Sequence, residues 1–123
     1  MRNISGVLVL VLGGMFGGAF SVNAFANVDE TAARGLAKQN GCFKCHNLTR
    51  EDQAKKEKDG KPWGEVAEKY AGKADASDKL VVHVTSGNKM KFPDGHEEEH
   101  KIIKTKDMVQ IKNLVDWILT LKP

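Results

Sequence analysis

The clearest periodic pattern of apolar residues lies near the C-terminus. Four apolar residues recur there at intervals of three and four: Met108, Ile111, Val115 and Ile118. This spacing places them on one face of an amphipathic helix. We expect the helix to begin at Thr105 or Asp107, because either side chain can cap an N-terminus.

Three shorter helices are predicted before it, over residues 31–40, 63–70 and 78–85. The first follows two acidic residues, which favour a helix N-terminus, and contains no proline. The third can be capped by Asp75 or Ser77. The chain shows no period-two alternation of apolar and polar residues, so the pattern does not predict a sheet. The pattern therefore predicts an all-α domain of about four short helices.

Two features stand apart from this helical pattern. Gly35 lies inside the first helix, where glycine costs about 1 kcal/mol relative to alanine, so we expect it to permit the close approach of another helix. Residues 47–61 are rich in charge and lack apolar periodicity. They are predicted to form a solvated loop or a frayed helical turn.

A dense apolar block occupies residues 4–20. Arg2 precedes it, and Ala24, Phe25 and Ala26 follow it as a small-x-small site, which is typical of a cleavable secretory signal. The alternative is a retained membrane anchor, but a spanning helix needs about 20 apolar residues. We therefore assign residues 1–26 to a signal peptide and residues 27–123 to the mature domain, and expect a periplasmic location.

Composition and charge narrow the classes of function. The chain has 123 residues, enough for one domain, and 19 basic against 16 acidic residues give a net charge of +3. This balance is too mild to indicate nucleic-acid binding. A domain of fewer than about 100 residues buries a modest fraction of its surface, so a disulfide, metal or cofactor is expected to supplement its core.

The only two cysteines, Cys42 and Cys45, are followed directly by His46. A thioredoxin-type redox pair would belong to a βαβ unit, and no strand pattern precedes it. A structural zinc site would need four ligands, and there is no second cysteine pair. The third interpretation uses the histidine as well, because Cys-x-x-Cys-His is the signature of covalent c-type haem attachment.

Haem chemistry explains this spacing. Cys42 and Cys45 can each form a thioether to one of the two vinyl groups of haem, and His46 then lies beneath the ring with its imidazole directed at the iron. A covalently attached apolar disc also supplies the core supplement that a chain of this size needs. We therefore expect one haem c with its iron as the cofactor.

With this motif the chain resembles the class I cytochromes c over nearly all of residues 28–121. The helix containing Gly35, the segment 66–72 and the C-terminal helix containing Trp117 support the resemblance. It implies an all-α class I cytochrome c fold wrapped around one haem. It also implies that Pro62 offers its carbonyl to the second nitrogen of His46, and that Trp63 and Tyr70 belong to the haem pocket.

The resemblance implies a distal methionine from the loop before the last helix, and here the chain departs from the family. His100 lies where that methionine is expected, thirteen residues after Gly87 and seventeen before Trp117. A neutral imidazole can bind iron as a thioether does. We therefore predict bis-histidine ligation by His46 and His100, with Met90 or Met108 as alternative distal ligands.

The remaining candidates have simpler interpretations. Met108 lies on the apolar stripe of the last helix, where a core role is more usual than ligation. His83 lies on an otherwise aliphatic helix and is interpreted as a helix-face residue and not a second haem contact. His96 follows the turn sequence Pro93-Asp94-Gly95, so it is expected at the tip of a turn.

These expectations favour a one-electron carrier that is not an enzyme, because no set of nucleophile, base and orienting group is recognisable. The alternatives are a protein that binds or senses NO, CO or O2, and an electron-transfer subunit of a larger redox enzyme. Expected partners are redox proteins, which Lys38 and Lys44 could steer electrostatically. After signal cleavage we expect no membrane attachment and a monomer or weak oligomer.

Overall fold

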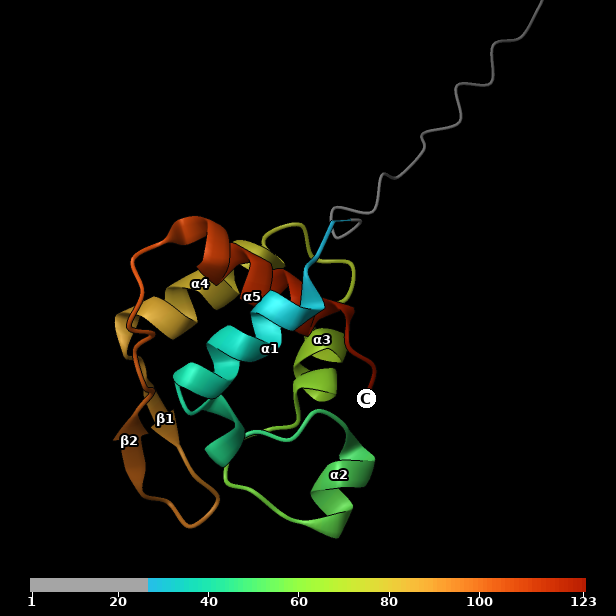
Figure 1. Cartoon of the computed structure of the whole chain (residues 1–123). Coiled ribbons are helices and arrows are strands. Elements are labelled where there is room, and N and C mark those ends of the chain that lie inside the picture. Colours follow the sequence, from blue (N-terminus) through green and yellow to red (C-terminus); the bar gives the residue numbers. More distant parts are fainter. Residues whose placement is uncertain (1–26) are drawn as a thin grey trace, which may run out of the picture.

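The computed structural model describes residues 27–123, so the predicted signal peptide, residues 1–26, lies outside the described residues. Within residues 27–123 the chain forms five α-helices, one 3-10 turn and a two-stranded sheet (Figure 1). In chain order they are α1 (Glu30–Gln39), the 3-10 turn (Cys42–Lys44), α2 (Arg50–Lys55), α3 (Trp63–Tyr70), α4 (Ala76–Ser86), β1 (Lys89–Lys91), β2 (Glu97–Glu99) and α5 (Met108–Thr120).

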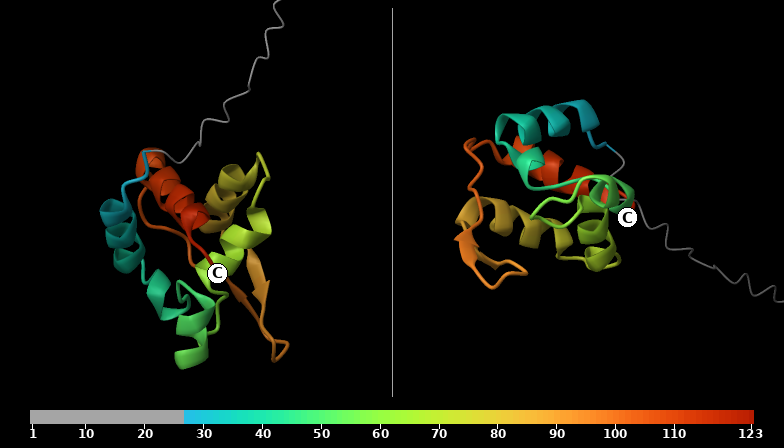
Figure 2. Two further views of the ribbon diagram at one scale, coloured as in Figure 1. Left: turned by 90° about the vertical axis from the view of Figure 1, so that its right-hand side faces the viewer. Right: turned by 90° about the horizontal axis from the view of Figure 1, so that it is seen from below.

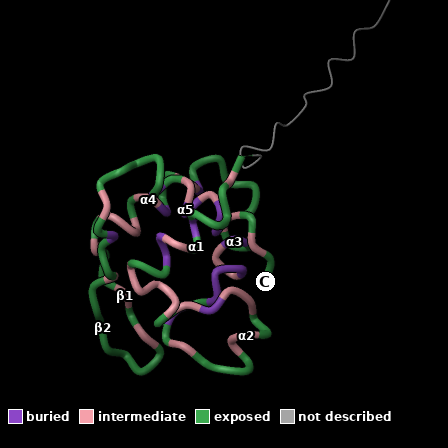
Figure 3. The backbone as a smooth tube through the Cα atoms, in the orientation of Figure 1, coloured by how far each residue is buried: buried purple, intermediate pink, exposed green. Residues whose placement is uncertain are grey.

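Helix α5 lies at the centre and packs against α1, α3 and α4 (Figure 2). Its apolar face supplies the largest part of the core, and the buried segments gather where these helices meet (Figure 3). The buried α5 residues are Ile111, Leu114, Val115, Trp117 and Ile118. The predicted apolar stripe is therefore confirmed from Ile111 onward. The prediction that Met108 belongs to the core is wrong, because this residue is 55% exposed.

Capping residues define where the helices begin. The Asp107 carboxylate accepts hydrogen bonds from the amides of Val109 and Gln110, at 2.9 and 3.3 Å, so α5 is capped by Asp107. Asp29 caps α1 in the same way through the amide of Ala32. These bonds satisfy donors that a helix N-terminus otherwise leaves without a partner.

A short hairpin corrects the expectation that the fold contains no sheet. Strands β1 and β2 pair antiparallel, with Lys89 opposite Glu99 and Lys91 opposite Glu97. Each strand has only three residues and no apolar alternation, so the hydrophobic pattern could not reveal it. Opposite charges directly across an antiparallel pair stabilise the register. The predicted turn is present, since the amide of Gly95 donates to the carbonyl of Phe92 at 2.9 Å.

Part of the charged segment 47–61, predicted as a solvated loop or a frayed helical turn, forms the short capped helix α2. Thr49 caps it, and its side-chain oxygen accepts from the amide of Asp52 at 3.1 Å. Arg50 connects α2 to α3 through Glu65 at 2.9 Å and Glu68 at 2.5 Å. The segment is therefore anchored beside α3. Helix α2 and the hairpin both extend from the same end of the helical core (Figure 1, Figure 2).

The expected role of Gly35 is wrong. Helix α1 does pack against α5, but a Cβ built on Gly35 would meet no atom within 4 Å. The helix instead presents Ala33 and Ala37, both 0% exposed, to the core. The small side chains of these alanines, and not the missing side chain of Gly35, therefore permit this packing. None of the helices in residues 27–123 has the length and apolar character needed to cross a membrane.

Candidate functional site

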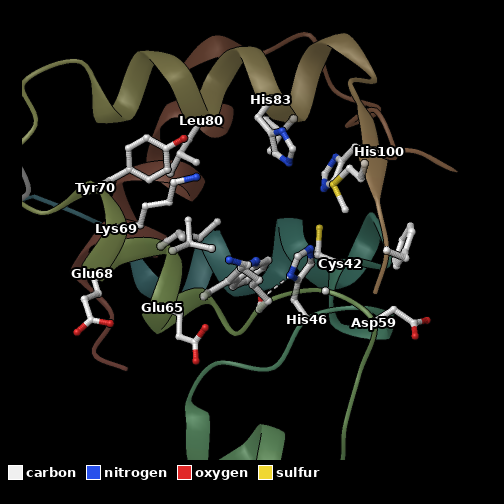
Figure 4. A pocket seen from close by; sticks show the side chains of 18 of the residues that line it. Cys42, His46, Asp59, Glu65, Glu68, Lys69, Tyr70, Leu80, His83 and His100 are labelled. Atoms are coloured by element: carbon white, nitrogen blue, oxygen red, sulfur yellow. Dashed lines mark hydrogen bonds between the residues drawn. The ribbon is translucent and has the colours of Figure 1, made fainter. Parts of the chain in front are cut away.

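A cavity of about 840 Å³ lies between α3, α4, the hairpin and the turn that follows α1. Its volume falls within the range of about 300–1,000 Å³ that is typical of cofactor pockets. Figure 4 shows Cys42 and His46 directed into the cavity from one side, and His83 and His100 from the other. The fold thus brings residues from distant parts of the sequence to one cavity.

The turn that carries the cysteines begins where α1 ends. Gly41 has a φ of 69°, a left-handed conformation that glycine adopts without strain, and it directs the chain into the 3-10 turn. The amides of Cys45 and His46 both donate to the carbonyl of Cys42, at 3.2 and 3.0 Å. Cys42 and His46 line the cavity, whereas Cys45 is exposed and is not among its lining residues. Lys44 is exposed in the same turn.

The predicted role of the Pro62 carbonyl is wrong, and Lys61 takes that role. The Nδ1 atom of His46 lies 2.8 Å from the carbonyl oxygen of Lys61. The Pro62 carbonyl instead accepts from the amides of Glu65 and Val66, in the first turn of α3. Because Pro62 is the N-cap residue of that helix, its carbonyl is already bonded within the first turn, and the carbonyl of Lys61 is the one that faces the imidazole. Pro62 is not among the residues that line the cavity.

The bond to Lys61 decides which nitrogen of His46 is available. An imidazole that donates from Nδ1 keeps its lone pair on Nε2, and such a partner also fixes the orientation of the ring. His46 is therefore arranged to present Nε2 to a metal ion in the cavity.

Gly60 is a site residue that the sequence analysis missed. Its amide donates to the carbonyl of Cys45 at 2.7 Å. A Cβ built on Gly60 would lie 2.6 Å from that carbonyl oxygen and 2.6 Å from ring atoms of His46. These distances are too short for any side chain, so glycine is required here. No periodicity or motif marks this position, because the constraint comes from a contact between separate segments.

His100 faces His46 across the cavity. The centroids of the two imidazole rings are 6.2 Å apart. A first-row metal ion binds an imidazole nitrogen at about 2 Å, and a ring nitrogen lies about 1 Å from its ring centre, so two imidazoles on opposite sides of one ion have centroids about 6 Å apart. The observed separation would therefore leave room for one metal ion between the two rings.

A second observation concerns the nitrogen atoms of His100. Its Nδ1 atom is buried and has no hydrogen-bond partner among the described residues. The backbone amide of His100 donates to the carbonyl of Asn88 at 2.9 Å, which fastens the residue to the hairpin. A buried imidazole whose hydrogen-bonding capacity is not met within the chain suits a role as a ligand.

His83, interpreted as a helix-face residue and not a second haem contact, lies on the face of α4 that meets the cavity. His83 lines the cavity, and its ring centroid lies 4.3 Å from that of His100. The position of a residue on a helix follows from the sequence, but which face meets a cavity depends on how the helix packs. The distal side of the cavity therefore holds two imidazoles.

The two methionine alternatives differ in position. Met90 is half-buried on β1 and lines the cavity, so it stays an alternative distal ligand. Met108 is exposed at the start of α5 and is not among the lining residues. His96 lies at the base of the turn and not at its tip, because its carbonyl accepts from the amide of Phe92 at 2.9 Å. Its side chain contacts Asp94 and stacks on Phe92 with 4.4 Å between ring centroids.

Aromatic residues form the wall beside His46. Trp63 is 5% exposed, stacks on His46 at a centroid distance of 5.5 Å, and meets Trp117 edge-on at 5.7 Å. Tyr70, at the end of α3, also lines the cavity. Trp63 and Tyr70 therefore both line the cavity.

Burial changes the acid–base behaviour of the site. It lowers the pKa of His46, His83 and His100 below the ordinary value for histidine, and it raises the pKa of the Cys42 thiol. Neutral imidazoles keep a lone pair for a metal ion. The donor set and the lining residues therefore fit the haem that the cysteine motif predicts.

No protein-family model matches this chain. Two curated proteins are similar to it in sequence. Cytochrome c-552 of Hydrogenobacter thermophilus is 33% identical over 87 residues, which cover 71% of this chain and 79% of that protein. Cytochrome c2 of Rhodocyclus tenuis is 36% identical over 97 residues, which cover 76% of this chain and 94% of that protein.

Solved structures that are similar in fold and sequence include two cytochromes. The crystal structure of the class 1 cytochrome MtoD from Sideroxydans lithotrophicus ES-1 superposes with a TM-score of 0.69 at 59% identity. The match covers 79% of this chain and all of that one. Cytochrome c552 of Nitrosomonas europaea superposes with a TM-score of 0.53 at 29% identity, over 72% of this chain and 99% of that one.

Proposed function

The chain belongs to the class I c-type cytochromes, monohaem electron carriers with covalently bound haem c, and on that basis we propose an exported carrier with bis-histidine ligation. In this proposal His46 is the proximal ligand and His100 the distal ligand. Cys42 and Cys45 form the two thioethers, and Trp63 and Tyr70 contact the haem.

The observation that carries the proposed ligation is the separation of the two imidazoles. His46 and His100 face each other with centroids 6.2 Å apart, although they are far apart in the sequence. Lys61 holds His46 through Nδ1, and the hairpin holds His100 through its backbone. Two ligands that are each held in place favour electron transfer, because a change of oxidation state then needs little rearrangement.

Haem iron, when bound, supplies a one-electron couple between its ferric and ferrous states. The chain contributes the ligands that adjust this couple. A histidine–methionine pair raises the potential, whereas a second imidazole donates more strongly to ferric iron and lowers it. We therefore expect a low-spin centre with a comparatively low potential.

Carbon monoxide distinguishes the carrier from a protein that binds small ligands. With His46 and His100 both bound, the ferrous protein is expected to keep its spectrum when carbon monoxide is added, because no coordination position is open. Optical absorption before and after mixing measures this. Rapid and complete formation of a carbon monoxide complex would instead favour a protein that senses or binds NO, CO or O2.

Export is proposed from residues 1–26, where Arg2, an apolar block and the Ala24–Ala26 site succeed each other. The mature protein is expected to begin at Asn27 and to occur in the periplasm. N-terminal sequencing of the protein purified from the periplasmic fraction measures this. A chain that keeps Met1 and stays with the membrane fraction would contradict cleavage.

A further inference from the structure

Lys58 places its ammonium group on the backbone of the haem-attachment turn. Its Nζ atom donates to the carbonyl of Phe43 at 2.5 Å and lies 3.4 Å from the carbonyl of His46. Both carbonyls belong to the segment that carries Cys42, Cys45 and the proximal histidine. Lys58 thus contacts the motif from the segment between α2 and α3.

A partly buried polar network holds Lys58 in this position. Gln53 donates from Nε2 to the carbonyl of Lys58 at 2.8 Å. Asn47, which is 8% exposed, donates to Gln53 at 2.6 Å and to the carbonyl of Lys56 at 2.7 Å. Buried polar groups that satisfy one another make a segment rigid. The charged segment 47–61 therefore folds back so that one lysine reaches the motif.

The charge of Lys58 is not neutralised by an ion pair. No carboxylate among residues 27–123 lies within ion-pair distance of its Nζ atom, whereas Lys55 pairs with Glu51 at 2.6 Å. Lys58 is half-buried, so its charge is screened less than that of an exposed lysine. A fixed positive charge beside the proximal ligand disfavours the ferric state, which carries one more positive charge than the ferrous state.

We propose that Lys58 is a positioning residue that holds the attachment turn and, through its charge, raises the reduction potential of the haem iron bound by His46. The proposal rests on the proposed function, since it requires haem on His46, but it does not depend on the identity of the distal ligand. It gives the segment 47–61 a role beyond a connection between helices.

The experiment compares four holoprotein variants by redox titration. Lys58→Gln keeps a donor for the carbonyls and removes the charge, whereas Lys58→Met removes both and Lys58→Arg keeps the charge. Lys56→Met is the matched control, because it removes an exposed lysine two residues away whose side chain makes no hydrogen bond in residues 27–123. The potential of each variant is measured at low and at high salt.

Lys58→Gln and Lys58→Met are expected to favour the ferric state by roughly three- to tenfold, where tenfold corresponds to about 59 mV for a one-electron couple. Lys58→Arg is expected to stay near the parent. The shift from Lys56→Met is expected to be smaller and to vanish at high salt, because its charge is exposed. If Lys58→Met does not assemble with haem, Lys58→Gln carries the test.

Equal shifts in Lys58→Gln and Lys56→Met overturn the role of Lys58. That failure is distinguishable from failure of the proposed function. If His46→Ala leaves the ferric spectrum of the holoprotein unchanged, His46 is not a ligand and the proposed function itself is wrong.

Discussion

Replacing both cysteines, by Cys42→Ala with Cys45→Ala, is expected to leave a chain that loses its haem on unfolding and is less stable by about 4 kcal/mol. A tethered group has an effective concentration in the millimolar range. Free haem at about 1 μM is about a thousandfold more dilute, which corresponds to about 4 kcal/mol of ligand-linked stability. When haem dissociates from the double variant, the 840 Å³ cavity is left partly unfilled.

Two measurements check this result. Denaturing gel electrophoresis with haem staining is expected to show haem on the parent chain and none on the double variant. Denaturant unfolding gives the loss of stability. The single variants Cys42→Ala and Cys45→Ala are the matched controls, because each keeps one thioether and therefore keeps its haem. Haem that stays on the double variant under denaturing conditions would contradict attachment through these two residues.

Replacing the distal histidine, by His100→Ala, is expected to open the iron to external ligands. An internal ligand leaves only a small fraction of the iron sites open, and the apparent affinity for an external ligand falls in proportion to that fraction. Removing the His100 imidazole is therefore expected to strengthen carbon monoxide binding about a hundredfold or more. The low-spin ferric spectrum is expected to be lost at the same time. Carbon monoxide titration of the reduced variant measures the change in affinity.

Two residues beside His100 provide the controls. His83 and Met90 also line the cavity, so His83→Ala and Met90→Ala each remove another donor and leave the proposed ligand His100 in place. Both are expected to keep the low-spin spectrum and the resistance to carbon monoxide. If Met90→Ala opens the iron and His100→Ala does not, the distal ligand is Met90.

Elements that depend on local signals were predictable from the sequence. The apolar stripe of α5 from Ile111 to Ile118 appears in the sequence at helical spacing, and the core of the fold is built on it. The motif of Cys42, Cys45 and His46 identifies its chemistry from three residue types at fixed spacing. The distal candidate His100 depended in addition on the resemblance to the class I cytochromes c, which implies a distal ligand at about this distance from Gly87 and Trp117, and the fold brings His100 opposite His46.

Features that depend on contacts between distant segments were not predictable. The hydrogen-bond acceptor for His46 is the carbonyl of Lys61 and not that of Pro62. A shift of one residue along the chain decides which carbonyl faces the imidazole and which accepts from the first turn of α3. His83 enters the cavity through the packing of α4. Gly60 is required by its contact with the His46 ring, and no local pattern marks such a contact.

The hairpin illustrates a further limit. Strands of three residues that carry mostly lysine and glutamate have no apolar face, so the hydrophobic pattern contains no sign of them. Their register places lysine opposite glutamate at two positions, and Gly95, with a φ of 91°, lies in the turn that joins the strands. This hairpin is nevertheless what supports His100, since the backbone amide of His100 bonds to Asn88, directly before β1.

The near-infrared and visible spectrum of the ferric protein tests the bis-histidine assignment most directly. With His46 and His100 as ligands, the ferric protein is expected to be low-spin and to lack the charge-transfer band from a sulfur ligand to iron. The parent chain and Met90→Ala are expected to give the same spectrum. A sulfur-to-iron band in the parent that disappears in Met90→Ala would contradict bis-histidine ligation.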